Sequence, residues 1–431
     1  MGLLDLMRVM SIQRQQDQER RRRQAQTQAC GKHPPLLISF LAHLPLCMPK
    51  PSGSGLSQAD LSLIGNKKDL IAAPDVPLSL FSWWLQKAVT PGIEELTLIL
   101  VPFSAKYNFP CSLLLNGSGD SIRYLHLTRC SFRPTVTLGL RSLMRLHLCL
   151  LELRNCDRIV CLKVPRLLQR LNYLEVRGCG KLKVIDNEAP NVSSFTFGGD
   201  STVQISLGET LQKKSLTMDR YGSVFYARAE LPSSMPNLEA LTIHSKSERA
   251  YAPMLCSKFL FLRHLSIALT GAPVYSTYDY LSLASFFYAA PSLETFNLNV
   301  WQRYMKNVSI FADPADLRQM QELQHHNLRS VSITGFSSAK SLVELTCHVL
   351  KSIISLECLT LEAPQSCVRC SDPANKSGKC SPLALDILME GHRAVMAIRK
   401  YIEPRVPSTV KLHVLEPCSC HDVELQMSCL S

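Results

Sequence analysis

The sequence predicts an α/β solenoid, in which short units stack into a curved parallel β-sheet with helices and loops on its outer side. Two observations lead to this fold class. A three-position aliphatic pattern recurs from about residue 78 onward, and its copies are spaced almost regularly along the chain. Because one such unit cannot bury its own apolar face, the stacking of neighbouring units must supply a continuous core.

The pattern is an aliphatic residue, a second one three positions later, and a third two positions after the second. Residues two apart in a strand point to the same face, so the second and third side chains point inward and the residue between them points outward. Ten copies have this form: Ile93–Leu98, Ile122–Leu127, Leu143–Leu148, Leu171–Val176, Val192–Phe197, Leu238–Ile243, Leu262–Ile267, Leu293–Leu298, Leu328–Ile333 and Leu356–Leu361. Weaker copies lie at Leu151–Leu153, Leu216–Met218 and Leu412–Val414.

The spacing of these copies is typical of leucine-rich repeats, because most intervals fall within or near the roughly 20–29 residues of that repeat. The longer intervals leave room for helices on the outer side. One interval is too short for a repeat, since Leu151 follows Leu146 by five positions (151 − 146 = 5). Either one of these two copies is not a strand, or a repeat is missing between His147 and Glu152. The sequence thus predicts a leucine-rich-repeat solenoid over residues 78–363 with a local irregularity.

The segments outside the repeats differ in composition from the repeats and from one another. Leucine and other aliphatic residues recur at helical spacing after Leu383, Pro404 stops that helix, and a strand pattern follows it. A helix and a strand there would close the end of the solenoid. The remaining assignments are a disordered Gln/Arg-rich tail (1–35), a Pro/Gly/Ser-containing linker (36–77), a Cys-containing loop (364–382), the helix–strand cap (383–425) and a short tail (426–431).

Charge and composition disfavour two classes of partner. The net charge is +12, of which residues 1–35 contribute seven basic minus three acidic residues, or +4, and the rest is spread along the chain. A nucleic-acid binder concentrates positive charge on one face, so nucleic acid is not the expected partner. The N-terminus is apolar first and Arg-rich afterwards, the reverse of a secretory signal. We therefore expect a cytoplasmic or nuclear protein with free thiols and no membrane contact.

Motifs for catalysis are missing from the sequence. It contains no G-x-G-x-x-G, P-loop, G-x-S-x-G or H-E-x-x-H, so we expect no enzyme activity and no cofactor. The C-terminal cysteines are the one suggestive cluster: Cys367 and Cys370 form a C-x-x-C, and Cys380, Cys418 and Cys420 follow irregularly. A structural zinc site needs four ligands in a tetrahedron. A loop of free thiols is favoured over zinc, and no metal ligand is assigned.

The outward strand positions are the candidate partner-binding residues. They would lie on the concave strand face, where aromatic and arginine side chains are frequent binding anchors. The alternative is that they are ordinary exposed polar positions. The candidates are Tyr124, His126, Arg145, His147, Tyr173, Glu175, Arg177, Thr242, His264 and Asn297.

Three stretches carry a resemblance to a known family. They are Trp84–Val89 with Gly92–Leu98, then Leu231-Pro232 with Met235–Ile243, and finally Arg393–Val395 with Val406–Ser408 and Val414–Cys418. Over about residues 78–425 the chain resembles the leucine-rich-repeat region of plant F-box proteins of the FBD-associated type. The resemblance implies the substrate-recognition part of a ubiquitin ligase, in which an F-box docks on a Skp-type adaptor and the repeats select the protein to be ubiquitinated.

Residues 1–77 depart from this family because they show no F-box. Leu44-Pro45 has the expected start, but Cys47, Pro49 and Pro51 follow, and the prolines would break the helices of an F-box. A Skp-type adaptor is therefore a doubtful partner. We expect a protein–protein interaction module, and a truncated form without its F-box fits the sequence. The alternative is a free-standing leucine-rich-repeat scaffold or an immune-receptor-type recognition domain with no ubiquitin role.

Overall fold

The computed structural model divides the chain into two units, residues 1–56 and 57–431. The described residues all belong to the second unit, so the tail predicted for 1–35 and that for 426–431 lie outside them. Cys367, Cys370 and Cys420 of the cysteine cluster also lie outside. The described residues are 60–418, with gaps at 65, 73–77, 101–106, 116, 129, 132–139, 150–160, 179–181, 200–202, 207–213, 247, 249–256, 271–277, 302–306, 315, 321–323, 365–379 and 381–382.

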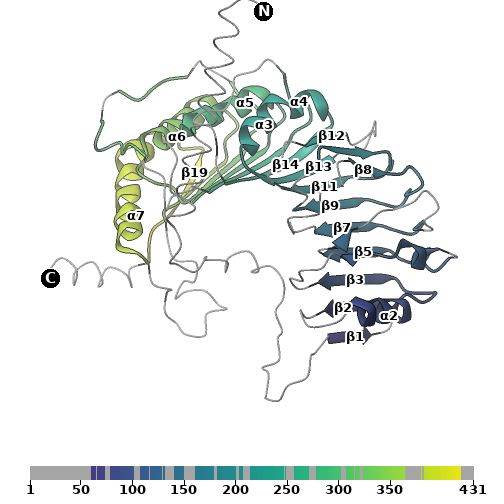
Figure 1. The fold of residues 1–431 in the computed structure, drawn as a ribbon. Helices are drawn as coiled ribbons and strands as arrows, with labels where there is room; N and C mark the ends of the chain where they lie inside the picture. Colours follow the sequence, from purple (N-terminus) through teal and green to yellow (C-terminus); the bar gives the residue numbers. More distant parts are fainter. Residues whose placement is uncertain are drawn as a thin grey trace, which may run out of the picture. The chain divides into compact units, whose positions relative to one another are not determined.

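One large sheet runs through the second unit, and its strands follow each other in chain order (Figure 1). Every pairing after the first is parallel, as the solenoid prediction requires, while β1 and β2 form an antiparallel pair. Within the described residues the sheet has fourteen strands: β1 (Asp60–Ile64), β2 (Lys67–Ala72), β3 (Glu95–Leu100), β5 (Tyr124–Thr128), β7 (Arg145–Cys149), β9 (Tyr173–Arg177), β11 (Ser194–Gly198), β13 (Lys214–Arg220), β14 (Leu238–Ser245), β15 (His264–Thr270), β16 (Thr295–Trp301), β17 (Ser330–Thr334), β18 (Cys358–Glu362) and β19 (Lys411–Leu415).

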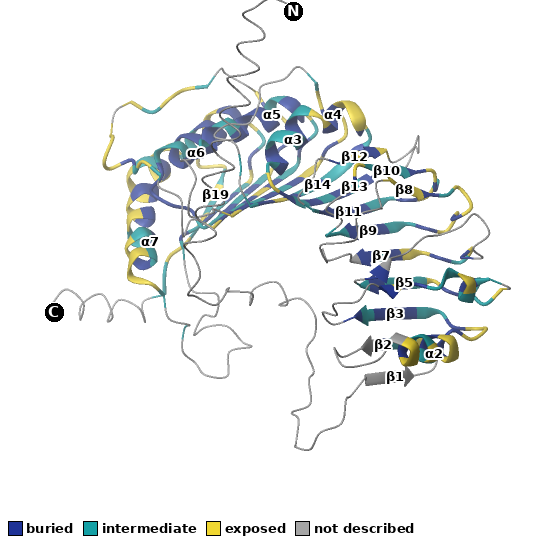
Figure 2. Cartoon of the chain, in the orientation of Figure 1, coloured by how far each residue is buried: buried dark blue, intermediate teal, exposed yellow. Residues whose placement is uncertain are grey.

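The register of the sheet confirms the repeat pattern residue by residue. The first inward residue of each copy pairs with its counterpart in the next strand, so that Leu96 faces Leu125, Leu125 faces Leu146 and Leu146 faces Leu174. The second inward residues form a parallel row. From Leu96 to Leu361 both rows are buried, and together they make the elongated core (Figure 2). The weaker copies at Leu216 and Leu412 are strands in this register.

The short interval after Leu146 begins in strand β7. This strand is hydrogen-bonded directly to β9, where Leu174 faces Leu146. The strand paired with β7 on this side of the sheet therefore comes 28 residues after Leu146 (174 − 146 = 28). Residues 150–160 themselves lie outside the described part. The two interpretations of the short interval concern a copy of the pattern that lies outside the described residues, and both stay predictions.

The outer side of the sheet changes character along the chain. Behind β7 to β13 it carries a small parallel sheet of β8 (Cys161–Val164), β10 (Val184–Asn187) and β12 (Gln204–Ser206), and nearer the start β4 (Tyr107–Asn108) pairs with β6 (Cys130–Ser131) beside η1 (Cys111–Leu114). Later connections hold helices: α3 (Ser223–Ala229), α4 (Leu231–Ser234), η2 (Tyr280–Leu283), α5 (Ala284–Ala289) and α6 (Lys340–Ser352) (Figure 1). Among the described residues no helix is long and apolar enough to cross a membrane.

The two ends of the solenoid can be compared with the boundaries predicted from the sequence. The sheet begins earlier than expected, because β1 and β2 lie inside the segment 36–77 that the sequence analysis assigned to a linker. Helix α2 (Leu78–Ala88) then buries Phe81 and Leu85 against the start of the core. At the other end, α7 (Leu385–Ala397) continues into a π-helical turn, η3 (Ile398–Ile402), and a 3-10 turn, η4 (Glu403–Arg405), before β19. The helix–strand order predicted for the cap is thus present.

Candidate functional site

The candidate site lies on the face of the sheet opposite the outer elements, which we call the open face. Strand alternation that points the leucines into the core turns the residue between them to this face. His126, His147 and Glu175 are these middle residues of β5, β7 and β9, and they face each other in register. Tyr124 and Tyr173 lie two residues earlier in their strands, on the same face.

Four aromatic rings meet on these three neighbouring strands. His147 is central, with its ring centroid 5.0 Å from that of Tyr124, 5.5 Å from that of His126 and 4.8 Å from that of Tyr173. The Tyr124 and His126 rings meet edge to face at 6.4 Å. All four side chains are half-buried, so the rings cover the sheet and still present part of their surface to solvent. Such contacts hold side chains in place before any partner arrives.

Glu175 connects two of these rings to Arg177 through hydrogen bonds. His147 Nδ1 donates to Glu175 Oε2 at 2.6 Å, the Tyr173 hydroxyl donates to the same oxygen at 3.0 Å, and Arg177 Nε donates to Oε1. Burial alone would raise the pKa of the Glu175 carboxyl. The hydrogen bonds from His147 and Arg177 outweigh burial and lower this pKa to about 2. Glu175 is therefore a carboxylate at any physiological pH.

The histidine and tyrosine side chains of the cluster also have shifted pKa values. Burial lowers the pKa of His126, and the neighbouring His147 lowers it further. A hydrogen bond of 3.2 Å joins His126 Nε2 to Thr128 Oγ1. Burial raises the pKa of the Tyr124 and Tyr173 hydroxyls, so both stay protonated and can donate hydrogen bonds. At neutral pH the rings of His126, Tyr124 and Tyr173 are thus uncharged and lie beside the anchored Glu175 carboxylate.

Arg177 extends the cluster across the next strands. Its Nη1 lies 3.6 Å from Asp219 Oδ2 in β13, although β11 lies between them. The β11 residue in register is Gly198, and a Cβ there would lie 3.3 Å from Arg177 Cγ, so the missing side chain leaves Arg177 room to cross. Asp219 Oδ1 is also 3.7 Å from Lys246 Nζ. We call Tyr124, His126, His147, Tyr173, Glu175 and Arg177 the platform, with Asp219 and Lys246 as its charged extension.

The structure brings together six of the ten predicted residues, places Arg145 at their border and separates the other three. Arg145 faces Tyr124 and Tyr173 in register from β7, where it is exposed at the border of the platform. Thr242 and Asn297 lie on the middle row of β14 and β16, and His264 Nδ1 is 2.9 Å from Thr295 Oγ1. Three strand spacings, about 14 Å, separate Glu175 from Thr242. These last three residues therefore do not belong to the platform.

Sequence reasoning missed Thr196, Asp219 and Lys246. The Tyr173 hydroxyl lies 3.3 Å from Thr196 Oγ1, which is the middle residue of the predicted copy Val192–Phe197 and so could have been included. Asp219 follows the weak copy Leu216–Met218 directly, and its contact depends on the register across Gly198. Lys246 lies just beyond β14, where no strand pattern signals its position.

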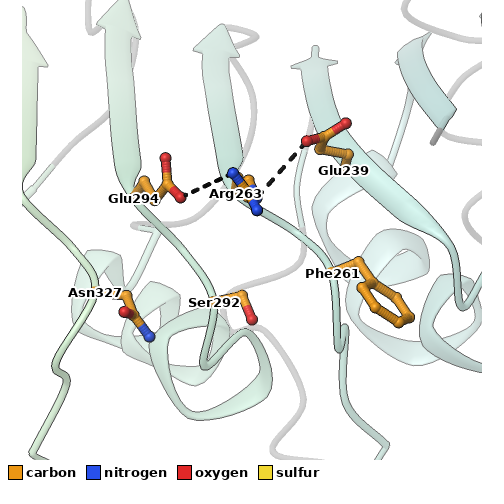
Figure 3. Close-up of a pocket in the computed structure, with 6 residues that line it drawn as sticks. All are labelled: Glu239, Phe261, Arg263, Ser292, Glu294 and Asn327. Atoms are coloured by element: carbon orange, nitrogen blue, oxygen red, sulfur yellow. Dashed lines mark ion pairs between the residues drawn. The ribbon is translucent and has the colours of Figure 1, made fainter.

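A small pocket lies elsewhere, where the chain enters β14 to β17 (Figure 3). Its volume is about 200 Å³, and its lining residues are Glu239, Phe261, Arg263, Ser292, Glu294 and Asn327. Arg263 stands between the two carboxylates: its Nε is 3.7 Å from Glu239 Oε1, and its Nη1 is 3.3 Å from Glu294 Oε1. We call this the rim pocket.

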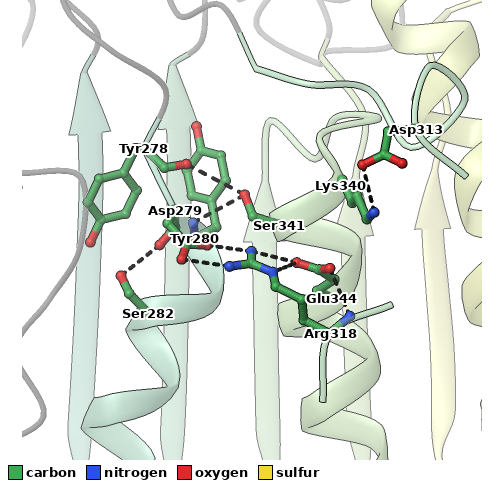
Figure 4. Close-up of polar contacts among 9 residues, drawn as sticks. All are labelled: Tyr278, Asp279, Tyr280, Ser282, Asp313, Arg318, Lys340, Ser341 and Glu344. Carbon is green, nitrogen blue, oxygen red and sulfur yellow. Dashed lines mark hydrogen bonds and ion pairs between the residues drawn. The ribbon is translucent and has the colours of Figure 1, made fainter. Parts of the chain in front are cut away.

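A polar cluster on the outer layer is structural (Figure 4). The Glu344 side chain of α6 is fully buried, and Arg318 donates to it from its backbone N–H at 2.9 Å and from Nε at 2.8 Å. The same guanidinium makes a two-bond contact of 2.8 and 3.0 Å with Asp279. Because these contacts join the segment before β17 to η2 and α6, Arg318 fixes the outer layer. Within the described residues no group of His, Cys, Asp and Glu is arranged to hold a metal ion.

Comparison with known proteins identifies the family. The model of the family described as At1g61320/AtMIF1, LRR domain, matches residues 48–151 and 148–419. This chain belongs to that leucine-rich-repeat family. The two matched segments meet at 148–151, the position at which the repeat interval is irregular. The match covers the leucine-rich-repeat part of the resemblance, whereas its F-box and FBD part stays a prediction. Searches of curated proteins and of solved structures gave no match.

Leucine-rich-repeat domains of this kind are generally protein-interaction modules and not catalysts. The fold explains why, because a stack of short strands presents a long surface built from many adjacent positions. Family membership thus supports the interaction role expected from the sequence and leaves the partner open.

Proposed function

We propose that this chain recognises a partner protein through the platform on its open face. The observation that carries the proposal is the assembly of three rings around that of His147, with hydrogen bonds from His147, Tyr173 and Arg177 to the Glu175 carboxylate. Tyr and Arg side chains dominate the energetics of protein interfaces, and a surface already held in one arrangement loses little entropy on binding.

The charge of the platform and its extension favours a partner surface that is neutral overall. Two carboxylates, of Glu175 and Asp219, lie beside two cations, of Arg177 and Lys246, and they pair with each other. Such paired charges provide orientation more than attraction. Binding by the platform should accordingly depend on the tyrosine rings and only weakly on salt concentration.

The proposal is tested by comparing captured partners between two matched double variants of the full chain. Tyr124→Ala/Tyr173→Ala removes two platform rings, whereas Trp301→Ala/Trp83→Ala removes two exposed rings that lie on β16 and α2. Quantitative mass spectrometry after affinity capture should show proteins retained by wild type and by the second variant and reduced at least tenfold with the first, as expected when anchors worth about 1.4 kcal/mol or more are lost. Equal capture by both variants would contradict the proposal. Thermal melting of both variants controls for folding.

The ubiquitin-ligase role implied by the F-box resemblance remains a narrower prediction. Its test is binding of the full chain to a purified Skp-type adaptor. Robust binding through residues 1–90 would show that an F-box function is present despite the prolines after Leu44. A chain that binds its partner through the platform and does not bind the adaptor would instead fit the free-standing scaffold.

A further inference from the structure

The rim pocket is built from equivalent positions of successive repeats. Glu239, Arg263 and Glu294 stand side by side, because the Arg263 N–H donates to the Glu239 carbonyl and the Glu294 N–H donates to the Arg263 carbonyl, each at 2.8 Å. Phe261, Ser292 and Asn327 form a second row below them (Figure 3). The pocket is the hollow between the two rows.

Several polar hydrogens of this pocket are already directed to acceptors within the chain. The Ser292 hydroxyl donates to the Leu260 carbonyl at 2.8 Å, and the Asn327 amide nitrogen donates to the Pro291 carbonyl at 2.8 Å. The Nε and Nη1 groups of Arg263 point to Glu239 and Glu294. As acceptors for a ligand the lining offers the carboxylate oxygens, the Ser292 lone pairs and the Asn327 carbonyl oxygen, beside the remaining N–H groups of Arg263 and Asn327.

Charge and aromatic surface point to the same class of ligand. Two carboxylates and one guanidinium give the lining a formal charge of −1, in a chain whose net charge is +12. The Phe261 side chain is 55% exposed, and an exposed phenyl face attracts a cation. A ligand that brings several donors, a positive charge and a flat apolar surface satisfies all three features. The guanidinium group, planar and with five N–H donors, has these properties.

The size of the pocket suits one side chain. Its volume of about 200 Å³ is below the roughly 300–1,000 Å³ of sites for drug-sized ligands. We propose that the rim pocket binds a guanidinium group, presented by an arginine side chain of a partner, which stacks on Phe261 and shares the carboxylates of Glu239 and Glu294 with Arg263. This second contact point lies on different strands from the platform and does not depend on it.

The test uses two small probes that differ in charge and little in shape. N-acetyl-arginine amide carries the guanidinium, and N-acetyl-citrulline amide replaces it with a neutral urea group. Titration of the full chain, followed by NMR or calorimetry, should give a dissociation constant in the millimolar range for the arginine probe, on the order of fivefold tighter than for citrulline, as for an exposed ion pair. Equal affinity for the two probes, or for N-acetyl-lysine amide, would overturn the guanidinium assignment.

Variants locate the binding within the molecule. Glu294→Gln should weaken the arginine probe about fivefold, and Phe261→Leu should weaken it by a similar factor while keeping apolar bulk. Glu357→Gln is the matched control, because Glu357 continues the same row of charges, 3.2 Å from Arg329 Nη1, and does not line the pocket. An equal loss with Glu357→Gln, or no loss with the first two variants, would refute the site. Platform variants should leave probe binding unchanged, so this proposal can fail while the proposed function stands.

Discussion

The strands from β3 to β11 and those from β13 to β18 share one core and differ on both of their surfaces. In the first region the outer side carries short strands and the open face carries the rings and charges of the platform. In the second region the outer side carries helices, and the middle row of the open face consists of small polar residues such as Thr242, Ser266 and Ser332. The two regions therefore share the same inward rows and the same strand pairing. Their outer sides and their open faces differ.

The largest expected effect comes from comparing one glycine near each region. Gly335, at a φ of +71° after β17, has the Val300 carbonyl oxygen 2.0 Å from where a Cβ would lie. Gly335→Ala should cost several kcal/mol or prevent folding, since backbone would have to move. Gly92 before β3 has a φ of +92° and open space around that position, so Gly92→Ala should cost about 1 kcal/mol from backbone strain alone. Urea unfolding of both variants measures the difference; similar losses would mean that packing near Gly335 yields readily.

A smaller loss of stability should follow from removing the Arg318 side chain, which joins parts of the outer layer. Arg318→Ala leaves the buried Glu344 carboxylate without its guanidinium partner, which should cost about 3 kcal/mol. Arg263→Ala is the control, because its partners are partly exposed, and it should cost less than about 1 kcal/mol. Chemical denaturation would show whether the two arginines differ in this way. Equal losses would contradict a special role for the outer helices in stability.

The smallest effect concerns the platform and depends on pH. The pKa of Glu175 is about 2 in the folded chain and about 4.5 ordinarily, so its contribution to stability is complete above pH 4.5 and is lost as the pH falls toward 2. Wild type should therefore lose on the order of 2 kcal/mol more than Glu175→Gln over this range. Denaturation midpoints at pH 5 and pH 2.5 measure it. Glu357→Gln should behave as wild type, and an identical pH profile for Glu175→Gln would remove Glu175 from the network.

The sequence predicts the core well because period-two alternation determines which residues face inward. The inward residues of all ten strong copies lie on strands with the expected register. The platform residues point to the open face for the same reason. The β1–β2 pair was missed because Lys68 occupies the position where the next strand has Leu96. The short strand β8 was missed although Leu162 and Val164 alternate with polar residues, since its signal covers four positions.

The candidate sites were predicted only in part, because some of their contacts join strands that are not neighbours. Neighbouring strands bring His126 and His147 together, and the alternation of inward and outward residues along each strand is enough to predict this contact. The Arg177–Asp219 pair depends on the absence of a side chain at Gly198 between them. The rim pocket collects side chains from the entries to four strands, and nothing in a single repeat indicates that Phe261 and Asn327 line the same hollow.

The residue-for-residue pairing of successive strands has a consequence for how such a chain can change in length. Aligned positions are separated by as few as 21 residues (146 − 125 = 21) and as many as 53 (412 − 359 = 53), yet both steps give the same lateral pairing. Since doubling the length of a flexible connection costs only about 0.6 kcal/mol, the outer connections can accept insertions at little thermodynamic penalty. A reporter peptide inserted there should be tolerated, whereas one extra residue inside a strand would exchange the buried and exposed faces of that rung.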